Sequence, residues 1–289
     1  MKSKITSVLR ILVCIIMVFA IIGTVGITTA DKLYTPEYLI SQVSSTNTYE
    51  NAYNSLMKRF SDNYSVSNIP KEVYEKSFSS EWMKASIDEK IRSNFENRDA
   101  VFDFSEAEKC ITEYFEEYAH EKHVIKDETY ENKLAQAVNY AQKTALNETD
   151  VYSFDVMNRA GIIGKISSAV ELVRKYKYVC IGVLIVLLII MIMLKRHVYW
   201  GGTALFSSGI LMAVPTTIVL ANHMIEKFSL KSFTTYTLVT GTLNSIVGII
   251  QKTGFVLLAT GVLFILIYCV FSKNERNAEN EKNDNPVSP

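Results

Sequence analysis

Four long, uncharged apolar runs constrain this chain more than any other feature. They cover residues 11–30, 178–194, 198–221 and 254–271, and none contains Asp, Glu, Lys, Arg or His. A hydrocarbon core about 30 Å thick requires roughly 20 apolar residues in a helix. Because backbone amides in lipid must find partners within the segment, each run is expected to be a transmembrane helix. The sequence therefore predicts an all-α integral membrane protein with four transmembrane helices and excludes a transmembrane barrel.

The first run has two interpretations. Its basic start at Lys2, Lys4 and Arg10 and the small residues that end it also suit a cleaved signal peptide. The apolar stretch from Ile11 to Ile27 is longer than the roughly 7 to 15 residues of a typical signal core. We therefore expect an uncleaved signal anchor, with cleavage as the alternative.

Basic residues beside the spans predict the orientation. They form three clusters, before the first span, between the second and third, and after the fourth: Lys2, Lys4 and Arg10; Lys195 and Arg196; Lys273 and Arg276. Basic clusters are retained in the cytoplasm. Both termini are therefore expected there, in the plasma membrane, with a large domain outside between the first two spans. Arg174, Lys175 and Lys177 oppose the rule beside the second span, but long domains are translocated regardless of such charges.

This topology divides the chain into nine segments. They are a cytoplasmic tail (1–10), the signal anchor (11–30), an extracytoplasmic domain (31–177), the second span (178–194), a cytoplasmic turn (195–197), the third span (198–221), an outer loop (222–253), the fourth span (254–271) and a cytoplasmic tail (272–289). The loop is expected to carry a short interfacial helix around residues 243–250, or an extension of the fourth span. The last tail is polar, contains two prolines and is expected to be disordered.

The extracytoplasmic domain is expected to be helical and acidic. Residues 31–177 hold 25 acidic and 19 basic side chains, a net charge of −6. This balance argues against nucleic acid as a partner, since phosphate binding requires a basic patch. Helix starts are expected at Thr35, before Pro36, and at a capping box formed by Ser105 and Glu108. The helix that follows Ser105 should end near Lys122, and the next should cover about 129–146.

Further helix is expected from Phe154 into the second span, either unbroken or bent near Gly161 and Gly164. The tyrosines of the domain, such as Tyr114, Tyr118 and Tyr140, are interpreted as core residues with solvated hydroxyls rather than as a ligand site. About 147 residues suffice for one compact core.

One candidate metal site stands out. Glu116, His120, His123 and Asp127 are spaced so that they would share one face of a continuous helix, and adjacent His and carboxylate groups can bind zinc. The opposite face carries Ile111 and other apolar residues, so the same four residues also suit an ordinary solvated face. The solvated face is preferred, and no catalytic residue or cofactor is expected.

The spans themselves lack catalytic or coupling groups. Ion-coupled transporters and intramembrane hydrolases place ionisable side chains at membrane depth, and these four runs contain none. Pro215 is expected to free a backbone carbonyl, and Gly209 with Ala213 offers a small-residue face for helix packing. The basic start, the Lys and Asn content and the four-span layout resemble membrane proteins of low-GC bacteria, a likeness of layout that implies no particular family.

The function expected from these features is interaction. The outer domain would act as a scaffold, accessory subunit or sensor for a membrane or envelope protein partner, and the chain is expected not to be an enzyme. A metal-assisted envelope hydrolase that uses His120 and His123 is the alternative, and a transporter or channel subunit is the third possibility. The lipid bilayer is the one partner that the composition itself requires. The oligomeric state is not indicated.

Overall fold

A computed structural model describes residues 2–193, 196–229 and 232–284, and 85% of it is helical. The described residues contain no strand, and four of their helices are long and apolar enough to cross a membrane. These are α1 (Lys2–Leu33), α10 (Ile162–Met193), α11 (His197–Ala221) and α12 (Phe233–Asp284). The expected all-α class is confirmed, and each of the four expected spans falls in one of these helices. The start of the expected cytoplasmic turn, Lys195, lies outside the described residues.

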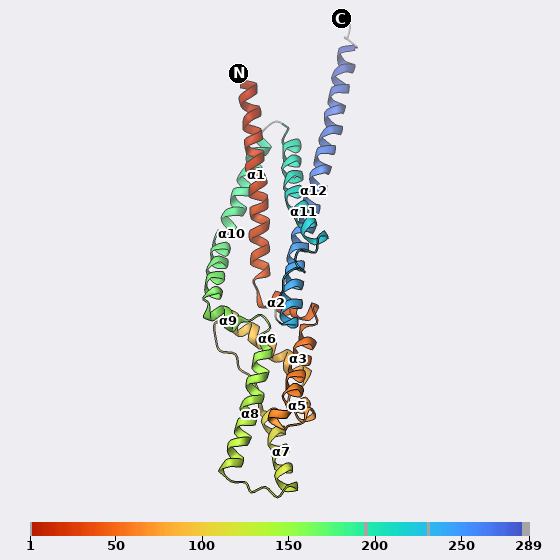
Figure 1. Cartoon of the computed structure of the whole chain (residues 1–289). Helices are drawn as coiled ribbons and strands as arrows, with labels where there is room; N and C mark the ends of the chain where they lie inside the picture. The colour runs from red at the N-terminus through yellow and green to blue at the C-terminus, as the bar shows by residue number, and fades with distance from the viewer. Residues whose placement is uncertain (1, 194–195, 230–231, 285–289) are drawn as a thin grey trace. The chain divides into compact units, whose positions relative to one another are not determined.

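Eight shorter helices precede α10 along the chain (Figure 1). They are α2 (Pro36–Ser45), α3 (Thr48–Asp62), α4 (Tyr64–Ser67), α5 (Lys71–Ser77), α6 (Ser80–Glu96), α7 (Ser105–Glu121), α8 (Glu128–Thr149) and α9 (Phe154–Arg159).

The helices form two compact units. One, called the bundle below, comprises the described residues of Met1–Leu33, Ser167–Lys227 and Leu243–Pro289. The other, called the helical domain, comprises Tyr34–Ile166 together with Phe228–Thr242. The helical domain is therefore assembled from two separate stretches of chain, whereas the sequence suggested the single stretch 31–177. The helices α10 and α12 each contribute residues to both units.

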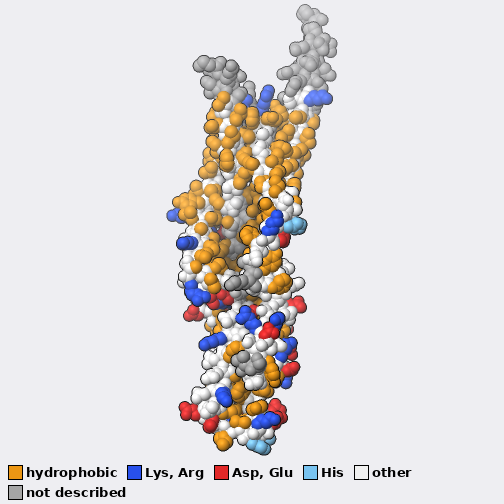
Figure 2. Space-filling view, in the orientation of Figure 1, with side chains coloured by type: hydrophobic (Ala, Val, Ile, Leu, Met, Phe, Trp, Pro, Cys, Tyr) orange, Lys and Arg blue, Asp and Glu red, His pale blue; other side chains and the backbone are white. Residues whose placement is uncertain are grey.

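The bundle buries several small residues and exposes many large ones. Its interior includes Ala204, Ser208 and Ala213, which are almost fully buried, while large apolar side chains of α1, α10 and α12 point outward (Figure 2). The helix α1 packs on α11 through a cluster that includes Met17, Ile21 and Ala204. An apolar exterior is what a helix bundle presents to lipid.

Four glycines bring α11 and α12 into close contact. Gly202 and Gly209 lie seven residues apart on α11, as do Gly254 and Gly261 on α12. A Cβ atom on Gly209 would lie 2.7 Å from the carbonyl oxygen of Gly254, and one on Gly261 would lie 2.8 Å from that of Gly202. The pairs 202 with 261 and 209 with 254 define an antiparallel contact, which we call the glycine seam. The small-residue face expected at Gly209 and Ala213 is thus confirmed as a packing face.

The core of the helical domain is aromatic and aliphatic. Phe60 stacks on Tyr74 with ring centroids 3.8 Å apart, and Phe78 lies 5.8 Å from Phe60. Leu238, from the first turns of α12, is 0% exposed and belongs to the same core cluster. The second stretch of chain therefore completes this core.

Of the two expected helix starts, one is confirmed and the other is wrong. The Thr35 hydroxyl accepts a hydrogen bond from the amide of Tyr38 at 3.3 Å, so this cap is confirmed. The capping box at Ser105 and Glu108 is wrong, since Ser105 is already the first residue of α7. Its amide donates instead to Asp103 Oδ1 at 2.9 Å, and Glu108 accepts from Gln142 at 2.8 Å. An aspartate two residues upstream is the stronger competitor for that amide.

Two expected boundaries also change, whereas the bent alternative near Gly161 is confirmed. The helical segment around 243–250 is an extension of the fourth span, because α12 is continuous from Phe233 and no proline interrupts it. A separate interfacial helix is therefore wrong. The tail expected to be disordered is helical as far as Asp284, consistent with its Glu, Lys and Ala content, and residues 285–289 lie outside the described part. Between α9 and α10 the chain turns at Gly161, whose φ of 67° suits glycine.

Candidate functional site

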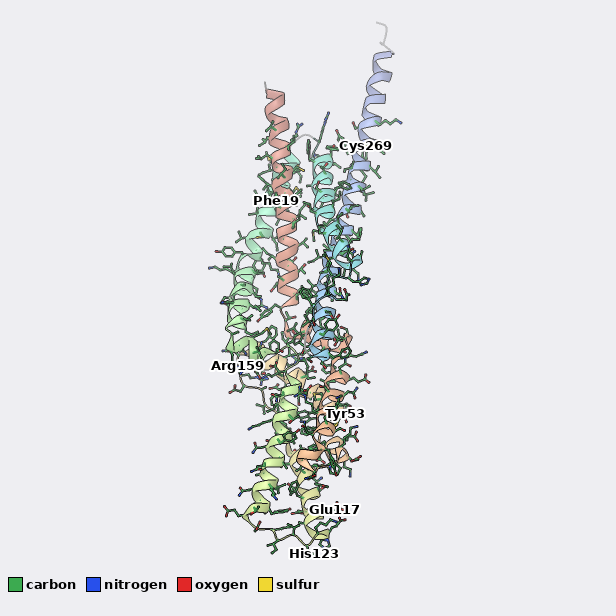
Figure 3. All side chains as sticks on the ribbon, viewed as in Figure 1. Phe19, Tyr53, Glu117, His123, Arg159 and Cys269 are labelled. Atoms are coloured by element: carbon green, nitrogen blue, oxygen red, sulfur yellow. The ribbon has the colours of Figure 1, made fainter. Side chains whose placement is uncertain are left out.

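The four candidate metal ligands are not brought together. The helix α7 ends at Glu121, and His123 adopts a left-handed conformation with φ of 51° in the connection to α8 (Figure 3). Because no helix continues to Asp127, the four residues have no common helical face. Among the described residues, no group of three or more His, Cys, Asp or Glu side chains is placed to hold a metal ion.

Two of the four have other partners. The Asp127 carboxylate caps α8 by accepting a hydrogen bond from the amide of Tyr130 at 3.0 Å. Glu116 lies 3.6 Å from the ammonium of Lys126, and both side chains are half exposed. His120 and His123 are exposed. The spacing that suggested a metal site therefore arises from a helix end and the cap of the next helix.

A groove of about 840 Å³ lies instead between α7, α8 and the connection from α4 to α5, and we call it the tyrosine groove. Its lining residues are Tyr64, Ser67, Asn68, Ile69, Tyr114, Phe115, Tyr118, Lys133, Gln136, Ala137 and Tyr140. The helices α7 and α8 pack side by side in Figure 1 and supply its two walls. This volume is within the range of about 300–1,000 Å³ that is usual for small-molecule sites.

Local structure fixes one wall of the groove. Asn68 takes a left-handed conformation, with φ of 53°, which ends α4 and turns the chain towards Pro70. The Tyr114 hydroxyl donates to the carbonyl oxygen of Asn68 at 2.9 Å, and buried Ile69 anchors the turn in the core. The wall is therefore held by both a hydrogen bond and apolar packing.

Aromatic rings cover much of the groove surface. The Tyr114 ring centroid lies 6.1 Å from that of Phe115 and 6.5 Å from that of Tyr118. Tyr64 and Tyr118 are 52% and 50% exposed, so their ring faces are available to a ligand. Core tyrosines that serve only as packing would not leave half their surface to solvent.

The polar groups of the groove are nearly all neutral. Lys133 is the one charged side chain among the described residues that line it. Burial raises the pKa of the Tyr114 phenol, and nearby Tyr64, Tyr118 and Glu121 act in the same direction, so this hydroxyl stays protonated. The Tyr140 hydroxyl is buried and has no hydrogen-bond partner within the described structure. A buried hydroxyl of this kind is usually satisfied by a partner, water or a ligand.

The sequence contained a signal for the α8 wall of this groove, although not for the groove as a whole. Lys133, Gln136, Ala137 and Tyr140 follow one another at the i, i+3, i+4, i+7 spacing of a single helix face. Tyr114 and Tyr140 pack at the edge of the domain core, as expected, and both also line the groove.

A second hollow, of about 370 Å³, lies in the bundle between α1 and α11. Most of its lining is apolar, and it includes Phe19, Trp200 and the hydroxyls of Thr203 and Ser207. Lipid chains are the expected neighbours of such a surface.

The end of α1 is tied to α10 by charge. Asp31 lies 2.9 Å from Arg174 Nε and 2.7 Å from Lys177 Nζ, all within the bundle. Arg174 and Lys177 are two of the three basic residues beside the second span that oppose the orientation rule.

The chain matches no known protein family, no curated protein and no solved structure.

Proposed function

We propose that this chain is a multi-pass plasma-membrane protein whose helical domain lies outside the cytoplasm and recognises a ligand or partner there. The observation that carries the proposal is the tyrosine groove, with its two half-exposed aromatic rings, its neutral hydrogen-bonding groups and its single cation. Tyrosine is favoured at recognition surfaces because it offers a large, rigid contact area and a polar tip.

The orientation rests on charge. The three basic clusters of the sequence fall on one side of the four spans. With both termini in the cytoplasm, the tyrosine groove is presented to the envelope.

The sensor version of this function is favoured over a passive scaffold. The continuous helix α12 places Leu238 in the core of the helical domain and Gly254 and Gly261 in the glycine seam. A rearrangement of the domain core on binding would therefore act on a helix that also packs within the bundle. Coupling of this kind requires a continuous element whose equilibrium both sites can bias.

An enzyme is not proposed. The hydrolase hypothesis depended on a metal held by His120 and His123, and α7 ends before the second of them. A transporter is not proposed either, because the described residues around Pro215 add only hydrogen bonds within the helix, from the hydroxyls of Thr216 and Thr217 to the carbonyl oxygens of Met212 and Ala213.

Orientation is tested by cysteine labelling in intact cells. In a background without the four native cysteines, Ala100→Cys should react with an impermeant maleimide, and Asn280→Cys should react only after permeabilisation. Labelling of position 280 from outside would overturn the topology and with it the proposed function.

Recognition is tested by photocrosslinking from the groove in native membranes. A photoreactive amino acid at Tyr118 should give a defined adduct, and the same residue at Val101, which is 78% exposed outside the groove, should not. An identical adduct pattern from both positions would show that the groove has no special role.

A further inference from the structure

We infer that the tyrosine groove binds a short carbohydrate chain that carries a carboxylate. This inference rests on the proposed function, because it names the class of ligand that the extracytoplasmic groove would take.

Size favours a small ligand over a protein surface. A groove of about 840 Å³ is concave enough for a chain of a few sugar rings and falls in the range of about 300–1,000 Å³ for small-molecule sites. Protein partners, in contrast, are usually bound by flatter surfaces that bury roughly 800 Å² on each side.

The arrangement of aromatic and polar groups matches the two sides of a sugar ring. A pyranose presents an apolar face of C–H groups and an edge of hydroxyls. The half-exposed rings of Tyr64 and Tyr118 suit the apolar face. The amides of Asn68 and Gln136 and the hydroxyl of Ser67 suit the edge, since each can both donate and accept hydrogen bonds.

The charge of the groove favours carbohydrates that carry a carboxylate. Lys133 is the one cation in the groove, and no carboxylate is present among its described lining residues. The helical domain around it carries an excess of acidic side chains, since residues 34–166 hold 23 acidic and 15 basic side chains, a net charge of −8. A ligand with several phosphates would be repelled by that surroundings, whereas a single carboxylate can pair with Lys133.

The test uses the full-length protein in phosphatidylcholine nanodiscs, because detergents with sugar headgroups would compete. Saturation-transfer NMR and titration would compare 3′-sialyllactose, a trisaccharide with one carboxylate, with 3′-galactosyllactose, a neutral trisaccharide. Sialyllactose should bind more tightly. Lys133→Gln should weaken its binding about tenfold, as expected for loss of a charged hydrogen bond, and should bring it to the level of galactosyllactose.

Matched variants separate the groove from the general surface. Tyr118→Ala should also weaken binding about tenfold, whereas Tyr176→Ala, an exposed tyrosine of α10, should leave it unchanged. Lys143→Gln, on α8 but outside the lining, is the control for Lys133→Gln. Unchanged fluorescence of Trp82 would show that each variant of the helical domain is folded.

Three outcomes would overturn the inference. They are no binding of either sugar by folded protein, binding that Tyr118→Ala and Lys133→Gln both leave unchanged, and tighter binding of a neutral proline-rich hexapeptide than of 3′-sialyllactose. The last result would assign the groove to extended peptides. In each case a groove-specific photocrosslink from Tyr118 would leave the proposed function standing, and its absence would remove both.

Discussion

The bundle and the helical domain differ in the side chains that they bury completely. The largest fully buried side chains in the described structure belong to the helical domain, among them Phe60, Tyr74 and Leu238. The residues buried in the bundle include Gly202, Ala204 and Ser208. The difference follows from the solvent, because water drives large apolar side chains into a core whereas lipid is as apolar as the side chains themselves.

Helices in lipid must therefore associate by close approach. The glycine seam permits backbone contact between α11 and α12, and Gln251 donates to the Thr217 hydroxyl across the same pair of helices at 2.9 Å. The helical domain has no need of such contacts. Each unit should thus be sensitive to a different substitution, and the two tryptophans can report them separately, since Trp82 lies in the helical domain and Trp200 in the bundle.

The largest effect is expected at Leu238. Leu238→Ala should destabilise the helical domain by about 2–5 kcal/mol, because it removes a fully buried side chain from the core. Denaturant unfolding of full-length protein, followed by Trp82 in a Trp200→Phe background, measures this. Leu263→Ala on the same helix, at a side chain that is 54% exposed, is the control and should change little. Equal effects would mean that α12 does not complete the domain core.

The next effect is expected in the glycine seam. Gly209→Ala should destabilise the bundle by about 1–3 kcal/mol, because the new Cβ would lie 2.7 Å from the Cα of Leu258 and backbone must move. Gly201→Ala on the same helix meets no atom within 4 Å and serves as the control. Trp200 fluorescence in a Trp82→Phe background should report this loss of stability. Trp82 fluorescence in a Trp200→Phe background should report no loss in the helical domain. A matching loss in the helical domain would show that the units unfold together.

The membrane helices could be predicted from sequence because their cause is local. An uncharged run of about 20 residues has few alternatives in lipid, so the spans emerged from composition alone. The start of α2 was equally local, since Thr35 and Pro36 act within one turn. The register between two helices depends on both of them. The pairing of Gly209 with Gly254 therefore cannot be predicted from either segment alone.

The tyrosine groove could not be predicted for the same reason. Tyr114 and Asn68 lie 46 residues apart and become neighbours only through the tertiary fold. Leu238 lies still farther along the sequence from residues 34–166, which build most of the core to which it belongs. The capping box at Ser105 failed on a shorter scale, because Asp103 took the amide that the motif assigned to Glu108.

A smaller effect on stability is expected at Asp127, where two substitutions distinguish a helix cap from a metal ligand. Asp127→Ala should cost about 1 kcal/mol of stability in the helical domain, the usual loss for an N-cap, whereas Asp127→Asn should cost little because asparagine also caps well. Thermal unfolding of the full-length protein measures both. Zinc should not raise the unfolding temperature of the wild-type protein or of either variant. A zinc-dependent rise that Asp127→Ala and His120→Ala both abolish would restore the metal hypothesis.

The smallest effects concern two carboxylates of the helical domain with opposite environments. Hydrogen bonds from Arg98 hold the pKa of Glu89 below its usual range, with the Arg98 Nη2 to Glu89 Oε2 distance at 3.0 Å. Burial raises the pKa of Asp150, although its carboxylate accepts amide hydrogen bonds from Phe154 at 2.7 Å and Asp155 at 2.9 Å. The two groups should therefore respond to pH in opposite directions.

For Glu89, the folded state binds the proton less tightly than the unfolded chain. Its charge thus stabilises the fold above about pH 5, and that contribution fades as the pH falls through the lowered pKa. For Asp150, the folded state binds the proton more tightly, so its contribution is complete at low pH and is lost as the pH rises through the raised pKa. Titration of stability against pH should show these two trends with opposite slopes.

Glu89→Gln and Asp150→Asn test the contrast within one domain. The stability difference between wild type and Glu89→Gln should be under about 1 kcal/mol at neutral pH, because the pair is partly exposed, and should shrink between about pH 5 and pH 3. The difference between wild type and Asp150→Asn should instead grow in favour of wild type as the pH falls. Unfolding followed by Trp82 at a series of pH values measures both differences. Parallel slopes would mean that the buried carboxylate is stabilised in its charged form by the amides of Phe154 and Asp155 more than burial disfavours it. The backbone at the start of α9, and not solvent exclusion, would then set the charge of Asp150.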